Sequence, residues 1–247
     1  PDIAVAMPIM YQGKAIAIAA AMTHHQDVGG MAPGSVPTNA TEIFQEGVRI
    51  PPLKLRSEGK MNETFIAMMR QNVRMPDAFM GDLNAQIAAC TVGGRRLDKV
   101  AKKYGPALLQ TAFDELLDRS EQLTRSSLRK IPDGEYSYTD YLDNDGIDLE
   151  TPIPIQVCVK VHDGQLHCSF EGTASQVRGP FNCVPSGATA AALFAVRAIT
   201  DAEIPTNGGC FRPVSLSLPE GSLVNPRSPA PVNSRTATIK RITGCIL

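Results

Sequence analysis

The hydrophobic positions near the start of the chain form two β-compatible runs, Ile3–Ile9 and Lys14–Met22, separated by Tyr11-Gln12-Gly13. Two such runs joined by a short glycine-containing turn predict a β-hairpin. The second strand would end at His24–Asp27. A strand holds the side chains at its end rigidly, so we expect chemistry at this end of the hairpin.

The middle of the chain has apolar residues at the spacing of amphipathic helices, as Phe65, Met68 and Met69 illustrate. Methionine and phenylalanine at this spacing indicate core positions. Pro76 and Pro106 each suit the first turn of a helix, and Gly47 and Gly105 suit helix ends. The expected helices are Thr41–Glu46, Asn62–Asn72, Pro76–Cys90 with a continuation over Leu97–Tyr104 after an interruption at Gly93-Gly94, and Pro106–Arg129.

From Ile131 onward the pattern changes to strands and turns, which marks a possible subdomain border near that residue. The expected elements are strands over Tyr136–Leu142, Ile153–Val161, Gln165–Phe170 and Val214–Leu218, and a helix over Ser186–Thr200. Helices and strands stand in separate blocks rather than alternating. This favours an α+β fold of mixed sheets with packed amphipathic helices.

Composition excludes several classes of function. The 247 residues are 43% hydrophobic and carry a net charge of −1, so neither nucleic acid nor an anionic membrane is an expected partner. The longest nearly apolar stretch, Ala15–Met22, is too short to span a bilayer. The six cysteines are dispersed and form no Cys-x-x-Cys pair, which favours reduced thiols over disulfides and predicts a cytoplasmic location. The chain contains no Gly-x-x-x-x-Gly-Lys-Ser/Thr phosphate loop.

The segment His24-His25-Gln26-Asp27, followed by Gly29-Gly30, is the strongest candidate for chemistry. Imidazole and carboxylate groups close together are the ligands that Zn²⁺ or Mn²⁺ prefers. The pattern is short, and it equally fits a polar strand end whose histidines satisfy backbone groups. Strict alternation would place His25 and Asp27 on one face, whereas a turn would pair His24 with Asp27.

Three further segments are rich in glycine, asparagine and small polar residues: Gly81–Gln86, Glu171–Asn182 and Asn207–Arg212. Asparagine and glutamine offer both a donor and an acceptor to an amide or imide edge. Asn182 and Asn207 are therefore candidate substrate-binding residues. The same composition is typical of turns, and the residues alone leave both interpretations open.

Taken together, these segments resemble the hydantoinase B/5-oxoprolinase family over essentially the whole chain, in the family's order. The matching blocks are His24–Ser35, Gln45–Leu55, Gly81–Ile87, Ile131–Tyr136, Phe170–Gln176, Gly179–Asn182, Pro205–Pro213, Pro219–Pro226 and Pro229–Val232. Family members are longer. The resemblance implies that residues 1–247 are the central part of one hydantoinase B-like domain, with an Asn-Asp-Pro motif and a further histidine expected upstream of Pro1.

The resemblance implies a metal-containing subunit of an ATP-dependent cyclic amide hydrolase acting on a hydantoin, 5-oxoproline or another lactam. A hydantoinase A-type partner would hold ATP, which fits the absence of a phosphate loop here, and the two would form a hetero-oligomer. The B-type subunit would hold a divalent metal such as Zn²⁺ or Mn²⁺. Such a metal polarises a carbonyl group or generates hydroxide for attack on the activated substrate.

Carried over residue by residue, Asp27 is the first expected metal ligand and His24 the second, and both are the expected catalytic residues. His25 is an alternative ligand, because either imidazole could face the metal. Glu46 lies where some relatives place a further ligand. Two other functions remain open: the metal subunit of a ketone carboxylase related to acetone or acetophenone carboxylase, and a non-catalytic fragment that only assembles with its partner.

Overall fold

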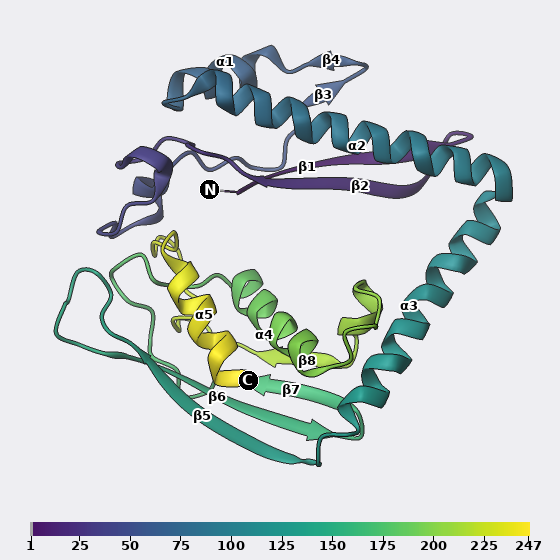
Figure 1. The fold of residues 1–247 in the computed structure, drawn as a ribbon. Helices are drawn as coiled ribbons and strands as arrows, with labels where there is room; N and C mark the ends of the chain where they lie inside the picture. The colour runs from purple at the N-terminus through teal and green to yellow at the C-terminus, as the bar shows by residue number, and fades with distance from the viewer. Residues whose placement is uncertain (1) are drawn as a thin grey trace. The chain divides into compact units, whose positions relative to one another are not determined.

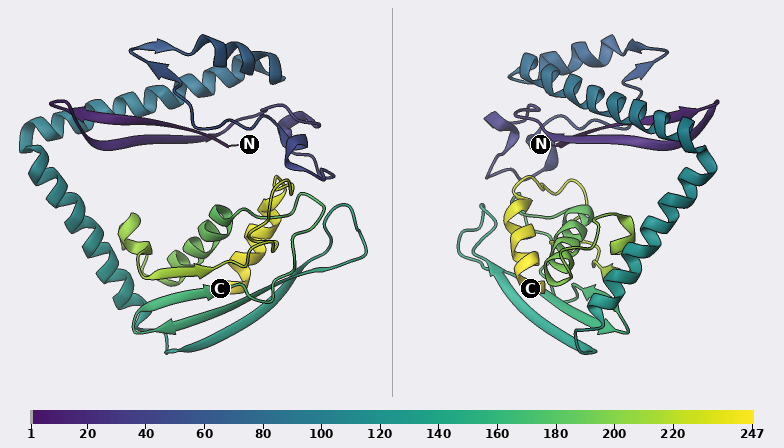
Figure 2. Two further views of the ribbon diagram at one scale, coloured as in Figure 1. Left: turned by 180° about the vertical axis from the view of Figure 1, so that it is seen from behind. Right: turned by 45° about the vertical axis from the view of Figure 1, so that its right-hand side comes forward.

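The computed structural model describes residues 2–247 and contains two compact units, which are treated separately. The first comprises the chain up to Val36 together with Glu46–Phe113, and the second comprises Pro37–Gln45 and Asp114–Leu247. Figures 1 and 2 show the elements of each unit. The change of pattern near Ile131 marks the passage from a helix to a sheet, whereas the units divide earlier, between Phe113 and Asp114.

The predicted β-hairpin is confirmed. Strands β1 (Asp2–Tyr11) and β2 (Lys14–His24) pair antiparallel through a turn at Gln12 and Gly13, both of which have positive φ. The pairing has a bulge, because Met10 faces Ala15 while Ile9 faces Ala17. Beyond the bulge the register is regular and places Asp2 opposite His24.

Helix α2 (Pro76–Tyr104) runs along one face of this hairpin (Figure 1). The interruption predicted at Gly93-Gly94 is wrong, because the helix is continuous across both glycines. Gly94 is buried, and a Cβ atom there would lie 3.1 Å from Cε of Met7 on β1. The glycine therefore reflects the close approach of helix and strand rather than a helix end.

The remaining elements of the first unit surround a small core. Helix α1 (Glu63–Asn72) is confirmed, and Asn62 caps it by accepting a 3.1 Å hydrogen bond from the Phe65 amide. Strands β3 (Arg56–Ser57) and β4 (Lys60–Met61) form a short second hairpin, and η1 (Pro33–Ser35) is a single 3₁₀ turn. The buried core residues are Phe65, Ile66, Met69, Val73, Phe79 and Leu83.

The helix predicted over Thr41–Glu46 is a 3₁₀ turn, η2 (Ile43–Glu46), that ends before Gly47. Helix α3 (Pro106–Leu128) is confirmed and connects the first unit to the second. Its start at Pro106 follows Gly105, whose φ of 82° is readily adopted by glycine and ends α2.

The second unit is built on a four-stranded sheet in the order β5-β6-β7-β8. Its strands β5 (Gly134–Leu142), β6 (Ile153–His162) and β7 (Gln165–Ser169) are antiparallel, and β8 (Val214–Ser217) is parallel to β7. These four strands confirm the predictions. Helix α4 (Pro185–Ile199) is confirmed as well, whereas α5 (Arg235–Ile246) was not predicted. Both helices lie on the same face of the sheet (Figures 1 and 2), and η3 (Gly208–Phe211) precedes β8.

The core of the second unit lies between the sheet and these two helices. Ile155, Val157 and Phe170 are fully buried there, together with Ala192 of α4 and Ile242 of α5. Alternation along β6 explains this, because every second residue from Ile153 to Val161 is buried. Helices covering one face of a mostly antiparallel sheet are the expected α+β arrangement.

All six cysteines are free. Burial raises the pKa of Cys168 to about 12 and that of Cys183 to about 11, so these thiols stay protonated and unreactive at neutral pH. No helix among residues 2–247 combines the length and hydrophobicity that crossing a membrane requires.

Candidate functional site

The two adjacent histidines at the end of β2 face opposite ways. His24 is exposed, and its Nδ1 lies 3.1 Å from Oδ1 of Asp2 on the neighbouring strand. His25 is completely buried on the side of α2. Successive side chains along an extended chain alternate between faces, so the arrangement follows from the strand itself. An imidazole and a carboxylate therefore converge at the surface, and the second imidazole is enclosed.

Gln86 of α2 fixes the position and tautomer of His25. Its Nε2 donates to the backbone oxygens of Ile3 on β1 (2.7 Å) and Ala21 on β2 (3.0 Å). Both amide hydrogens are then used, so Oε1 must accept from Nε2 of His25 at 3.0 Å. This assigns the hydrogen of His25 to Nε2. Its Nδ1 is buried with no hydrogen-bond partner among residues 2–247, and the ring centroid lies 5.1 Å from that of Phe79.

Asp27 is buried, and its carboxylate receives four hydrogen bonds. Oδ1 accepts from the amides of Gly29 (2.9 Å) and Arg74 (3.1 Å). Oδ2 accepts from the amide of Gly34 (3.0 Å) and from Nη1 of Arg74 (3.0 Å). Burial opposes ionisation, but the hydrogen bonds from Arg74, Gly29 and Gly34 outweigh it and hold the pKa of Asp27 below its ordinary value.

The Asp27–Arg74 ion pair organises the glycine-rich loop that follows β2. The guanidinium of Arg74 also donates to the backbone oxygens of Gly30 (2.7 Å) and Ala32 (3.1 Å). Gly29 has a φ of 85°, and a Cβ atom there would lie 2.5 Å from the backbone oxygen of Asn72, so this position requires glycine. The contacts give Asp27 a loop-anchoring role, and its role as a metal ligand stays a prediction.

Glu46, the other predicted ligand, is buried at the end of η2. The segment that follows it lies against the residue after Asp27, since the amide of Val48 donates to the backbone oxygen of Val28 at 2.8 Å. Within residues 2–247, however, no three His, Cys, Asp or Glu side chains are grouped as a metal ion would need. A metal held here by His24 and Asp2 would take its other ligands from elsewhere. The ligand assignments of His25 and Glu46 stay predictions.

The two asparagines predicted to bind substrate are engaged with their own unit. Asn182 is fully buried; its Nδ2 donates to the backbone oxygens of Val177, Gly179 and Pro231, and its Oδ1 accepts from the Val177 amide. Asn207 caps η3 through the Gly209 amide and donates to Oγ of Ser120 at 2.8 Å. These contacts explain both residues as supports of the backbone. Their substrate-binding role stays a prediction.

Sequence reasoning missed three side chains of this site: Asp2, Gln86 and Arg74. Asp2 had a detectable signal, because pairing the two predicted strands from their turn places the start of the first beside the end of the second. Gln86 stood out only as one amide in a polar segment. Nothing in the sequence near Arg74 links it to Asp27, because the two residues meet through tertiary packing.

The strand-end cluster consists of Asp2, His24, His25, Asp27, Arg74 and Gln86. Together with the fold, it defines an α+β protein with an imidazole–carboxylate pair at the open end of a hairpin. The family model described as hydantoinase B/oxoprolinase matches residues 1–247. The chain therefore belongs to the hydantoinase B/oxoprolinase family, which confirms the resemblance that the sequence indicated.

Named relatives agree with this assignment. The chain is 33% identical over 247 residues to a putative B-type subunit of a D-/L-hydantoinase from a Pseudomonas species, covering 95% of this chain and 42% of the relative. It is also similar to the crystal structure of the ATP-dependent caprolactamase of Pseudomonas jessenii, with a TM-score of 0.92 and 31% identity over 99% of this chain and 42% of the other.

A nucleotide-free structure of acetone carboxylase shares the fold, with a TM-score of 0.86 and 20% identity over 95% of this chain and 32% of the other. The chain spans less than half the length of the curated hydantoinase and caprolactamase subunits that it matches.

Proposed function

We propose that this chain is part of the metal-containing subunit of an ATP-dependent hydrolase that opens a cyclic amide. A hydantoinase A-type subunit would be its ATP-binding partner. Two findings support this: the family model that covers the whole chain and the similarity to the ATP-dependent caprolactamase. The observation within this chain that carries the proposal is the convergence of His24 and Asp2 at an exposed strand end.

The donor set at the strand end fits a borderline divalent cation. Imidazole nitrogen together with carboxylate oxygen suits Zn²⁺ or Mn²⁺. His24 Nδ1 and Asp2 Oδ1 already lie 3.1 Å apart, on paired positions of one hairpin, so little chain entropy is lost when both bind one ion. These two residues supply part of a coordination shell. A bound metal would supply Lewis-acid activation of the amide carbonyl or of a water molecule.

The protein's own residues hold this pair in place. The amide of Gln86 ties the start of β1 and the end of β2 to α2, which fixes the strand end that carries His24. The Asp27–Arg74 ion pair then anchors the glycine-rich loop that follows β2. Rigid support of this kind keeps ligand side chains in one geometry, which metal binding and catalysis both require.

Replacing His24 by alanine in the full protein with its partner tests the metal assignment. We expect the affinity for Zn²⁺ or Mn²⁺ to fall by at least about tenfold, measured by calorimetry and by metal analysis, with the circular dichroism spectrum unchanged because His24 is exposed. His162→Ala is the control, since His162 is an exposed histidine paired with an aspartate on another hairpin. Equal metal content in the two variants would refute the assignment.

Product analysis distinguishes the amide hydrolase from a ketone carboxylase. We expect ATP-dependent ring opening of a lactam or hydantoin at a rate that does not depend on added bicarbonate, because water and not bicarbonate is the group added to the carbonyl. Chromatography with mass detection measures the product. A carboxylated ketone formed only with bicarbonate would replace the hydrolase proposal, and a metal-free, inactive complex would favour a role in assembly alone.

A further inference from the structure

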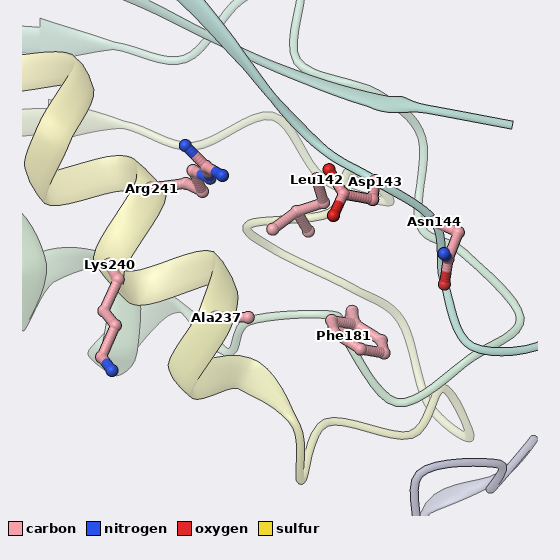
Figure 3. A pocket seen from close by; sticks show the side chains of 7 residues that line it. All are labelled: Leu142, Asp143, Asn144, Phe181, Ala237, Lys240 and Arg241. Carbon is pink, nitrogen blue, oxygen red and sulfur yellow. The ribbon is translucent and has the colours of Figure 1, made fainter. Parts of the chain in front are cut away.

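The second unit contains a cavity of about 430 Å³ between the end of β5, the loop before α4 and the first turns of α5 (Figure 3). Its lining residues are Leu142, Asp143, Asn144, Phe181, Ala237, Lys240 and Arg241. Sites for small ligands measure roughly 300–1,000 Å³, so the volume suits a small molecule. No lining residue belongs to the strand-end cluster of the first unit.

One part of the cavity lining is apolar. Leu142 is the buried last residue of β5, and Phe181 and Ala237 are half-buried residues that pack against the core of the unit. In Figure 3, Phe181 and Ala237 lie on one side of the cavity, and Leu142 and Asp143 lie on the other. A short aliphatic segment of a ligand would lie between these surfaces and lose contact with water.

Two side chains of opposite charge, Arg241 and Asp143, lie beside this surface, and both can form further hydrogen bonds. Nη1 of Arg241 donates to Oδ2 of Asp140 at 2.9 Å, and the guanidinium is half exposed, so its other donors remain accessible. The carboxylate of Asp143 is exposed and forms no hydrogen bond or ion pair within residues 2–247. Figure 3 shows Asp143 and Arg241 on the same side of the cavity. Asp143 and Arg241 form no ion pair with each other, so this anion and this cation next to one cavity are complementary to a ligand that carries both charges.

Asn144 and Lys240 complete the polar lining. Oδ1 of Asn144 accepts from the amide of Gly146 at 3.0 Å, which leaves the two hydrogens of its Nδ2 for a ligand oxygen. Lys240 is exposed and leaves α5 in a direction away from Asp143 (Figure 3). Asp140, Asp143, Lys240 and Arg241 together carry no net charge, so neither a polyanion nor a polycation is favoured here.

We propose that this cavity binds a small amino acid in its zwitterionic form. The carboxylate would accept from Arg241 and Asn144, the ammonium group would donate to Asp143, and the aliphatic chain would lie against Phe181 and Ala237. The inference rests on these side chains and not on the proposed function. It nevertheless matches the product of that reaction where the substrate is a lactam, because hydrolysis of a lactam leaves one carboxylate and one amine on the same molecule.

Titration of the full protein with 4-aminobutanoate, butanoate and butylamine tests the site. We expect 4-aminobutanoate to shift the NMR signals of the Asn144 side-chain amide and the Ala237 methyl group. We also expect it to bind about tenfold more tightly than either single-charge probe, because each of those makes only one of the two charge-assisted contacts with the site. Equal affinity for the three probes, or absence of shifts at these two residues, would overturn the proposal.

Asp143→Asn should weaken 4-aminobutanoate binding by about tenfold while leaving butanoate binding unchanged, because only the ammonium group loses its partner. Glu150→Gln is the matched control, since it removes an exposed carboxylate from the same connection between β5 and β6 without lining the cavity. The proposal fails if the two variants bind 4-aminobutanoate equally well. Because both substitutions are at exposed positions, the fold should be retained in each.

Discussion

Replacing Asp27 by alanine should lower the free energy of unfolding of the first unit by about 3 kcal/mol. The substitution removes the acceptor of four hydrogen bonds and leaves the amides of Gly29 and Gly34 without a partner inside the protein. It also leaves the guanidinium of Arg74 without its carboxylate. Urea denaturation followed by circular dichroism would measure the loss. The glycine-rich loop should become sensitive to proteases at the same time.

The ion pair between Arg70 and Asp77 provides a matched control in the same unit. Nη2 of Arg70 lies 2.9 Å from Oδ1 of Asp77. The side chain of Asp77 is almost fully exposed, whereas that of Asp27 is almost fully buried. Exposed pairs contribute only about 0–1 kcal/mol, so Asp77→Ala should have little effect. Comparable losses in the two variants would show that Asp27 does not anchor the loop. Loss of metal by Asp27→Ala without loss of stability would instead support a ligand role.

Acidification provides a second measurement of the same interaction. The pKa of Asp27 is lower in the folded protein than in the unfolded chain, so ionised Asp27 stabilises the fold at pH values above its unfolded pKa of about 3.9. That stabilisation is lost as the pH falls through the folded pKa. Asp27→Asn should therefore reduce the acid sensitivity of the first unit. An unchanged dependence of stability on pH would contradict this account.

Replacing Gly209 by alanine should destabilise the second unit by about 3 kcal/mol. A Cβ atom at Gly209 would overlap the backbone oxygen of Leu117 in α3, and the backbone cannot move aside as a flexible side chain can. Gly179 faces the same restriction against the backbone oxygen of Asp145. Alanine at either position should lower the thermal midpoint strongly or prevent folding, as monitored by circular dichroism and limited proteolysis.

Gly244 provides the comparison, because it lies in helix α5 of the same unit and a Cβ atom there would meet nothing within 4 Å. Alanine is favoured over glycine inside a helix by roughly 0.5–1 kcal/mol, so Gly244→Ala should stabilise slightly. If Gly209→Ala were as stable as Gly244→Ala, close backbone packing would not explain this glycine.

The sequence could predict the parts of the fold that depend on local patterns, but not those that depend on tertiary packing. The hairpin, α1, α3 and the strands β5 to β7 were predictable because their patterns are local. Gly94 suggested a break in a helix that is continuous, because the strand packed against it lies far away in the sequence. Helix α5 was not predicted, because its apolar residues form only a weak helical pattern. Its position in the core depends on packing against α4 and the sheet.

The site was predictable to a similar extent. The segment from His24 to Asp27 was identified from residue types, since two of the chain's four histidines stand there beside a carboxylate. Which histidine faces outward required the register of the hairpin. The sequence also could not show that Asp27 binds Arg74, because the contact depends on where α1 ends relative to the loop.

The bulge between Ile9 and Met10 has a consequence at the other end of the hairpin. It places one extra residue, Ile16, in β2 and so reverses which side of the hairpin each later residue of β2 faces. Without it, the same two strands would pair Asp2 with Thr23, turn His24 toward α2 and bring His25 to the surface. A local irregularity beside the turn thus determines that the imidazole of His24 is exposed to solvent and that the imidazole of His25 is buried against α2.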